Sequence, residues 1–263
     1  MEADNWRQLD FFDPAKSHPK VVVIGCGHIG SYAAFGLARL GVKDITVVDH
    51  DMVEPHNLPN QFFAESLVKD LPNDKPSLYK VVALQKTIQY LIPTAKITPV
   101  PMKVEAAEID ISTYPVVLVA VDDMNVRKWI WNKVCSMSSI TKFLIDARTG
   151  GEFANVFGIV LGHPQSHTVY DANLFDNSKA AELPCTGTAV IDVSLGVISD
   201  CINKYRQFVK TKQVKVIHSF HDYVVGTVSI MAMRSDDKIK TPRVVETPGV
   251  VDGDNVKESE NGR

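Results

Sequence analysis

Three glycines and an aspartate are spaced in this sequence as a site for phosphate and ribose requires. Gly25, Gly27 and Gly30 form a Gly-x-Gly-x-x-Gly pattern directly after the apolar run 20–24, and Asp49 closes the next apolar run. Glycines permit a tight turn and a close approach of the backbone to phosphate oxygens, which the N-terminus of a following helix also attracts. An acid at the end of the second strand can accept hydrogen bonds from ribose hydroxyls. The pattern therefore predicts an adenine-nucleotide site and by itself favours NAD, with a purely structural turn as the alternative.

The elements that must position these residues are alternating strands and helices. Residues 20–24 and 44–49 are typical of buried strands, and the apolar spacing between them predicts a helix that ends at Gly41. The alternation predicts an α/β fold, a Rossmann-like, doubly wound and mostly parallel sheet extended by antiparallel strands in the C-terminal half. Further helices are predicted over 76–92, 125–137 and 186–209, and further strands over 95–100, 115–121, 143–146, 153–161 and within 218–233.

Two segments of the C-terminal half carry more specific expectations. The stretch 162–183 is rich in polar turn-forming residues and is predicted to be a long loop. The helix over 186–209 is expected to bury one face. That face would carry Ile191, Leu195, Ile198 and Ile202.

Composition and charge exclude several classes of protein. The 263 residues are 45% hydrophobic and carry a formal net charge of −3, which argues against a disordered chain and against a general nucleic-acid-binding surface. No apolar run has the length of a membrane helix, and the N-terminus lacks the pattern of a secretory signal. The four cysteines, Cys26, Cys135, Cys185 and Cys201, form no Cys-x-x-Cys pair, so we expect a reducing, cytoplasmic location and no zinc.

The residues that follow Asp49 resemble those of the ThiF/MoeB/HesA-type activating enzymes, the superfamily that includes the ubiquitin-activating enzymes. The pattern there is Asp-x-Asp-x-Val followed by Asn-Leu-x-x-Gln, and it is matched by Asp49, Asp51, Val53, Asn57, Leu58 and Gln61. Further matches follow the family's order along the chain. They are Arg7 before the first strand, Lys80 at a helix start, Asp122 within 121–127, and Cys185 before the helix over 186–209. The resemblance spans about residues 6 to 233.

The resemblance implies ATP-dependent adenylation of a carboxylate, in which positioning and charge neutralisation do most of the work. The implied substrate is a small ubiquitin-like or sulfur-carrier protein that ends in glycine, and the implied assembly is a homodimer without nucleic-acid or membrane partners. Gly25, Gly27 and Gly30 would approach the phosphates, and Asp49 and Asp51 would hold the nucleotide. Lys80 and Arg7, the latter from the partner subunit, would offset negative charge, and Asp122 would bind Mg²⁺. Asn57 and Gln61 would hydrogen-bond phosphate or organise the loop.

Several of these assignments have alternatives. Lys75 competes with Lys80 as the phosphate-contacting lysine, and Asp122 and Asp123 could both cap the helix that follows. Cys185 would either take the acyl group in a covalent intermediate or only pack.

The main departure from the family pattern is Asn60, which stands where the family has arginine and carries no charge. Arg148 is a hypothesis for the compensating cation.

The resemblance also divides the chain. Residues 1–19 would be an N-terminal arm, and 20–233 a single ThiF-type adenylation domain with a nucleotide-binding half (20–150) and an antiparallel, substrate-binding half (151–233). Residues 234–263 contain no aromatic residue and are expected to be a disordered tail. Two rival functions are an NAD-dependent oxidoreductase and a catalytically silent nucleotide-binding scaffold.

Overall fold

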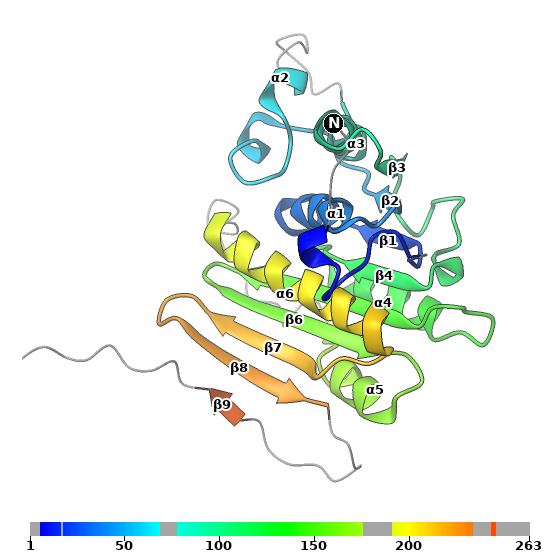
Figure 1. The fold of residues 1–263 in the computed structure, drawn as a ribbon, viewed down its shortest axis with the longest axis vertical. Coiled ribbons are helices and arrows are strands. Elements are labelled where there is room, and N and C mark those ends of the chain that lie inside the picture. Colours follow the sequence, from blue (N-terminus) through cyan, green and yellow to red (C-terminus); the bar gives the residue numbers. More distant parts are fainter. Residues whose placement is uncertain (1–5, 17, 69–77, 176–190, 234–242, 246–263) are drawn as a thin grey trace, which may run out of the picture.

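The computed structural model describes residues 6–16, 18–68, 78–175, 191–233 and 243–245, and they build one mixed sheet covered by helices on both faces (Figure 1). The strand order is β3-β2-β1-β4-β5-β6-β7-β8-β9. The strands are β1 (Val21–Ile24), β2 (Asp44–Val48), β3 (Lys96–Val100), β4 (Val116–Val119), β5 (Phe143–Gly150), β6 (Phe153–Val160), β7 (Val216–Asp222), β8 (Thr227–Ala232) and β9 (Arg243–Val245).

The two halves of the sheet differ in strand direction, as predicted. β3, β2, β1, β4 and β5 are parallel, with Val21 in register with both Ile45 and Val116. β1 and β4 are short, β-branched and buried along their whole length, which is typical of central parallel strands covered on both sides. From β5 to β9 each strand pairs antiparallel with the next. The predicted parallel sheet with an antiparallel C-terminal extension is confirmed.

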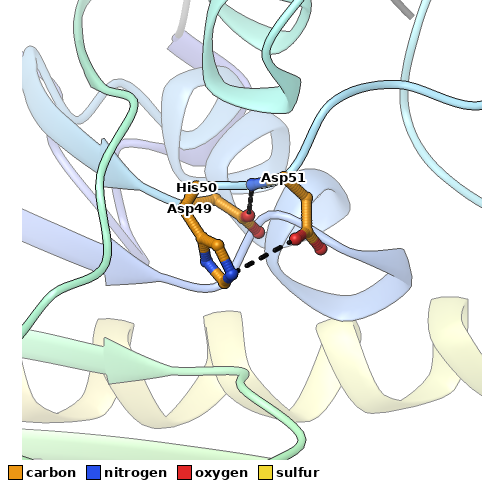
Figure 2. A group of neighbouring side chains, drawn as sticks. All are labelled: Asp49, His50 and Asp51. Atoms are coloured by element: carbon orange, nitrogen blue, oxygen red, sulfur yellow. Dashed lines mark hydrogen bonds and ion pairs between the residues drawn. The ribbon is translucent and has the colours of Figure 1, made fainter.

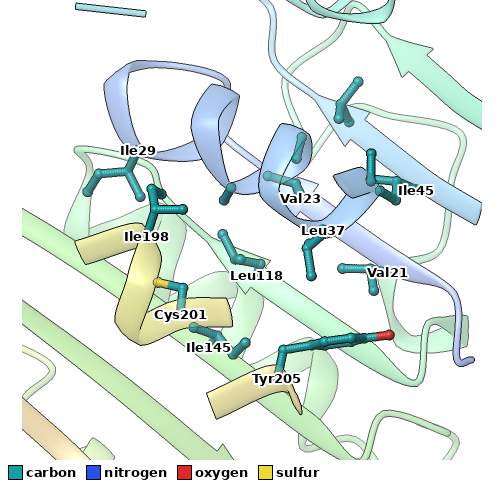
Figure 3. Packing of buried hydrophobic residues seen from close by; sticks show 14 of the residues in the cluster. Val21, Val23, Ile29, Leu37, Ile45, Leu118, Ile145, Ile198, Cys201 and Tyr205 are labelled. Atoms are coloured by element: carbon teal, nitrogen blue, oxygen red, sulfur yellow. The ribbon is translucent and has the colours of Figure 1, made fainter. Parts of the chain in front are cut away.

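Helices on opposite faces of the sheet bury two separate apolar clusters. Side chains of α1, α3 and α6 join Val21, Val23 and Leu118 in the larger cluster (Figure 3). α4 and α5 cover the other face, where Ile130 and Tyr170 meet the reverse side of the same strands. The helices are α1 (His28–Leu40), α2 (Glu65–Val68), α3 (Lys80–Leu91), α4 (Met124–Val134), α5 (Pro164–Asp171) and α6 (Ile191–Thr211), with 3-10 turns η1 (Trp6–Gln8), η2 (Pro55–Asn57) and η3 (Ile111–Thr113). Among these helices, none combines the length and apolar character that crossing a membrane requires.

The prediction of a long loop over 162–183 was wrong in its first part. α5 occupies Pro164–Asp171 and buries Val169 and Tyr170. Pro164 stands in the first turn, where its missing N–H is not needed and its fixed φ suits a helix. The polar residues that signalled a loop include exposed ones, Thr168 and Asp171, but also Ser166, which is buried where the helix packs on β6 and β7.

The predicted buried face of α6 was partly right, because Ile198 is buried and Ile202 is partly buried against the core. Leu195 and Ile191 are 53% and 37% exposed, whereas Val193, Val197 and Tyr205 are buried. The buried face includes Lys204, whose Nζ bonds Asp200 Oδ1 at 3.0 Å and Ser219 Oγ at 2.8 Å. A count of apolar residues does not identify this buried face, because it contains a lysine. The burial of that lysine depends on partners from another element.

The segment expected to be a disordered tail is described only at Arg243–Val245, which forms β9 against β8. The rest of 234–263 lies outside the described residues, as does the start of the helix predicted from residue 76; within the described chain, α3 begins at Lys80.

Candidate active site

Two positions of the glycine loop, Gly25 and Gly30, accept only glycine. Gly25 has a φ of +89°, and a Cβ there would lie 2.5 Å from the carbonyl oxygen of Ala120. A Cβ at Gly30 would lie 1.8 Å from the carbonyl oxygen of Gly25. In contrast, a Cβ at Gly27, the N-cap of α1, would meet nothing within 4 Å. The loop therefore has no room for side chains at Gly25 and Gly30, where it packs on the protein. It is open at the N-terminus of α1, where backbone N–H groups can face an anion.

Asp49 ties the end of β2 to this loop. Its Oδ2 accepts a hydrogen bond from Cys26 N at 2.6 Å, and its Oδ1 accepts one from Asp51 N at 2.8 Å. Burial raises the pKa of Asp49, although these bonds and the charge of Lys80 oppose that rise. Figure 2 shows the carboxylate beside His50 and Asp51, whose ligand atoms lie within 4.8 Å of one another. The predicted ribose-binding acid therefore sits at the mouth of the glycine loop.

Lys80 is brought to the same place by the first turn of α3. Its Nζ lies 2.8 Å from Asp51 Oδ2, its side chain is 11% exposed, and its backbone N–H donates to the carbonyl of Asp51. Partial burial favours the neutral acid at Asp51, but the hydrogen bond and charge of Lys80 lower its pKa below the usual value. The competing residue, Lys75, lies outside the described residues. Asp49, Asp51, Lys80 and the glycine loop thus form one group.

Asn57 and Gln61 organise the loop after β2. Asn57 is buried, and its Oδ1 accepts from the backbone N–H of Glu54, while its carbonyl accepts from Gln61 N. Gln61 Oε1 is buried and has no hydrogen-bond partner among the described residues. The loop is docked on the first turn of α1, because Phe62 N donates to Ser31 Oγ at 2.9 Å. Of the two predicted roles for Asn57, the structure shows the organising one.

The two adjacent aspartates after β4 have different positions. Asp123 is the N-cap of α4, and its side chain accepts from Asn125 N at 2.7 Å. Asp122 is exposed and does not serve as this cap. The sheet order reverses between β1 and β4, where ligands of such sheets bind, and Ala120 N bonds Ile24 O at 2.8 Å. Asp122 is therefore an exposed carboxylate two residues after Ala120, whose backbone contacts the glycine loop, and it is not the N-cap of α4.

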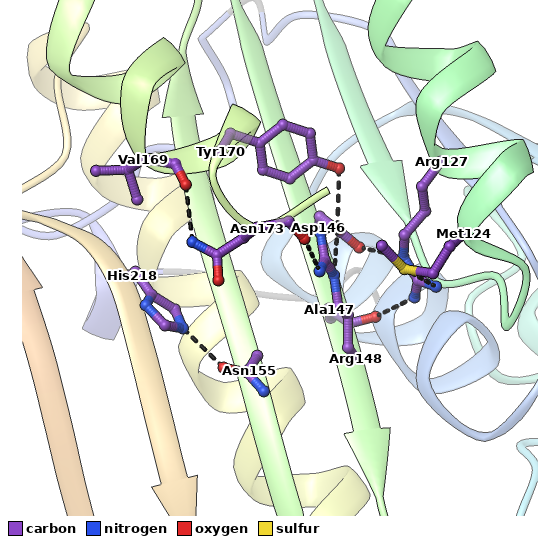
Figure 4. Close-up of polar contacts among 10 residues, drawn as sticks. All are labelled: Met124, Arg127, Asp146, Ala147, Arg148, Asn155, Val169, Tyr170, Asn173 and His218. Atoms are coloured by element: carbon purple, nitrogen blue, oxygen red, sulfur yellow. Dashed lines mark hydrogen bonds and ion pairs between the residues drawn. The ribbon is translucent and has the colours of Figure 1, made fainter. Parts of the chain in front are cut away.

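Arg148, the hypothesised compensating cation, is held by contacts with Asp146 and Asn173. Its Nη2 lies 2.7 Å from Asp146 Oδ2, and its Nη1 donates to the carbonyl of Asn173 (Figure 4). Arg127 and Tyr170 bond the same buried carboxylate. Burial acts to raise the pKa of Asp146, but the two guanidiniums hold it below its usual value. These contacts argue against Arg148 as the compensating cation for Asn60, because its guanidinium is held by a buried carboxylate that it shares with Arg127. Nucleotide binding by Arg148→Ala tests the hypothesis.

Acid is expected to destabilise the antiparallel half through His218. Its Nε2 bonds Asn155 Oδ1 at 2.8 Å (Figure 4), and burial, together with the charges of Lys204 and Arg148, lowers its pKa to about 4. Between pH 6.5 and 4 the unfolded chain binds a proton that the folded chain does not, so the free energy of unfolding falls as pH falls, by at most about 1.4 kcal/mol per pH unit. Urea titrations across this range check the slope.

The variant His218→Gln keeps an amide for Asn155 and cannot titrate, so its stability should depend less on pH over this interval. His56→Gln, which changes an exposed histidine, is the matched control. An unchanged slope in His218→Gln would contradict this assignment.

Arg7 and Cys185 are not brought to this group within the described chain. Arg7 is exposed in η1, and the neighbouring Gln8 donates to the carbonyl of Leu40 at the far end of α1. That end lies roughly 20 Å along the helix from the glycine loop. Cys185 lies outside the described residues.

His28 and Thr149 were not predicted as site residues. His28 begins α1 inside the glycine motif, and its Nε2 lies 2.6 Å from Thr149 Oγ1 on β5. The sequence indicated this contact only weakly, through a histidine at one of the x positions of the Gly-x-Gly-x-x-Gly pattern.

The family model described as the ThiF family matches residues 10–237. The chain is 28% identical over 179 residues to the sulfur carrier protein ThiS adenylyltransferase of Escherichia coli (strain K12), covering 68% of this chain and 67% of that protein. It is 28% identical over 134 residues to the NEDD8-activating enzyme E1 catalytic subunit of Schizosaccharomyces pombe (strain 972), covering 50% of this chain and 28% of that protein.

Among solved structures, E. coli MccB crystallised with MccA superposes with a TM-score of 0.62 at 16% identity, covering 85% of this chain and 66% of that chain. A likeness at this identity concerns the fold. The chain thus spans under a third of the curated NEDD8-activating relative and about two thirds of MccB.

Proposed function

Because the chain belongs to the ThiF family, we propose that it activates a carboxylate by transferring AMP to it from ATP. The carboxylate oxygen attacks the α-phosphorus, the bond to the bridging oxygen breaks, and pyrophosphate leaves with that electron pair. The observation that carries the proposal is the contact of Lys80 with Asp51 beside Asp49 and the glycine loop. This contact holds the ammonium group of Lys80 near the glycine loop, whose backbone is open to phosphate.

Each residue of this group has a defined task in that reaction. The N–H groups at the start of α1 bind phosphate oxygens, and Asp49 accepts from the ribose hydroxyls. The ammonium group of Lys80 is shared between Asp51 and the phosphates, and it offsets their negative charge as pyrophosphate departs. This is electrostatic stabilisation by a preorganised group. Asp122 fits Mg²⁺, since it is an exposed carboxylate at the switch point with no capping role. The ion, when bound, neutralises phosphate charge.

The proposed substrate is the C-terminal carboxylate of a small ubiquitin-like or sulfur-carrier protein that ends in glycine. This follows the names of two relatives, which act on NEDD8 and on the sulfur carrier protein ThiS. Transfer of the acyl group to Cys185 is a second, separable step of the proposal.

A homodimer is part of the same proposal. Within one chain Arg7 lies toward the end of α1 remote from the glycine loop, which supports a role at the nucleotide of a second copy.

Calorimetric titration with Mg·ATP and, separately, with NAD tests the proposed function. Binding of Mg·ATP is expected, and Asp122→Ala should weaken it by about tenfold or more, because a carboxylate next to a bound cation contributes a few kcal/mol. Asp123→Ala is the matched control, since it removes the cap of α4 at a cost of about 1 kcal/mol in stability and leaves the proposed Mg²⁺ ligand intact. Binding of NAD alone would favour an oxidoreductase, and binding of neither would favour a silent scaffold.

A further inference from the structure

His28 occupies the first position of α1, directly after the N-cap Gly27. Its backbone is therefore part of the helix N-terminus that the proposed function assigns to phosphate binding. The space above Gly27 is open, because a Cβ there would have no neighbour within 4 Å. The side chain of His28 is partly buried and begins beside this open helix N-terminus.

The imidazole of His28 is held by one hydrogen bond from a distant part of the chain. Its Nε2 lies 2.6 Å from Thr149 Oγ1, on the part of β5 that extends beyond β4. Its other ring nitrogen, Nδ1, has no hydrogen-bond partner among the described residues, and it is not one of the fully buried polar atoms. Thr149 therefore fixes the ring from one side and leaves Nδ1 accessible.

The surroundings keep this imidazole neutral near pH 7. Burial and then the charge of Lys80 lower the pKa of His28 below its usual value. A neutral imidazole has one donor nitrogen and one acceptor nitrogen, and a threonine hydroxyl can turn to donate. When the Thr149 hydroxyl donates to Nε2, the proton of the ring is on Nδ1, which becomes a donor.

We propose that His28 donates a hydrogen bond from Nδ1 to a phosphate oxygen of the bound nucleotide, with Thr149 as the positioning residue that selects this tautomer. The inference rests on the proposed function. It assigns a neutral donor to a site in which Lys80 is paired with Asp51, while Arg148 on β5 and Arg127 on α4 are bound to Asp146. A neutral donor adds a contact to the phosphates without a second buried cation beside Lys80.

Two substitutions at position 28 separate the two ring nitrogens. In His28→Asn the amide nitrogen is attached where Nδ1 is and can still reach the phosphate, whereas in His28→Gln the amide is placed to bond Thr149. His28→Gln is expected to weaken Mg·ATP binding by about tenfold or more, the usual range for a lost hydrogen bond to a charged group, and His28→Asn much less. Thr149→Val should weaken Mg·ATP binding less than His28→Gln does. Thr149→Ser, which keeps the hydroxyl, should bind Mg·ATP as the unsubstituted protein does.

The measurement is calorimetric titration of each full-length variant with Mg·ATP and with adenosine, which lacks phosphate. A loss for Mg·ATP that is absent for adenosine supports the phosphate contact. An equal loss for both ligands, or no loss in His28→Gln while the unsubstituted protein binds Mg·ATP, overturns this inference and leaves the proposed function standing. Absence of Mg·ATP binding by the unsubstituted protein overturns both.

Discussion

Replacing Lys80 with alanine is expected to lower the rate of pyrophosphate exchange by about 10²- to 10³-fold, the usual effect of removing one preorganised charge-stabilising group. Lys80 is the lysine that the structure places at the glycine loop, with its side chain largely buried and 2.8 Å from Asp51. The substitution removes the cation and also leaves Asp51 without its partner, so a carboxylate would then face the triphosphate. Both changes act against the build-up of charge on the departing pyrophosphate.

Exchange between labelled pyrophosphate and ATP, with a candidate carrier protein present, measures this rate. Lys86→Ala on the exposed side of the same helix α3 is the control, and it should leave the rate within about twofold because surface substitutions change little. In the double variant Lys80→Ala with Asp51→Ala, part of the rate should return, since the unpaired acid is gone. Full activity of Lys80→Ala would transfer the role to another lysine, such as Lys75.

The largest effect on stability is expected at Asp146. Asp146→Asn should lower the free energy of unfolding by about 3–5 kcal/mol, because removing one partner of a buried ion pair leaves uncompensated charge inside the protein. Here two guanidiniums lose their partner at once: the Nε of Arg127 lies 3.0 Å and the Nη2 of Arg148 2.7 Å from a carboxylate that is fully buried. Tyr170 loses an acceptor at the same position.

Urea denaturation followed by circular dichroism measures this change. Glu152→Gln, an exposed acid in the turn between β5 and β6, should change stability by less than about 0.5 kcal/mol. A comparably small change in Asp146→Asn would mean that the cluster in Figure 4 does not stabilise the fold. The nucleotide affinity of any folded Arg148→Ala chain should stay unchanged, since Arg148 faces Asp146.

The nucleotide-binding half of the fold could be predicted because its signals are local. Gly25 adopts a positive φ and Gly30 has no room for a Cβ, so both glycines are backbone requirements that the sequence displays directly. The strand–helix alternation likewise follows from spacing within short segments. The same holds for Asp49, which ends a strand and so comes to the sheet edge with the glycine loop.

The sequence-based predictions were incomplete or wrong for residues whose position depends on another element of the fold. α5 and the buried face of α6 depend on partners elsewhere. α5 packs on β6 and β7, and the buried Lys204 donates a hydrogen bond to Ser219 on β7 while Asp200 pairs its charge. The apolar count predicted that Leu195 is buried, whereas it is 53% exposed among the described residues.

By itself, then, the sequence determined the alternating strands and helices of the nucleotide-binding half, the glycine loop and its acid, and the family that these motifs indicate. Only the tertiary structure decided which charged groups remain available for a ligand. Asp123 caps a helix while Asp122 does not, Arg148 is bound to Asp146, and His28 is fixed by Thr149 from β5. The physical reason is that backbone conformation is set by neighbours in the chain, whereas the cost of burying a charge is met by partners that only folding brings near.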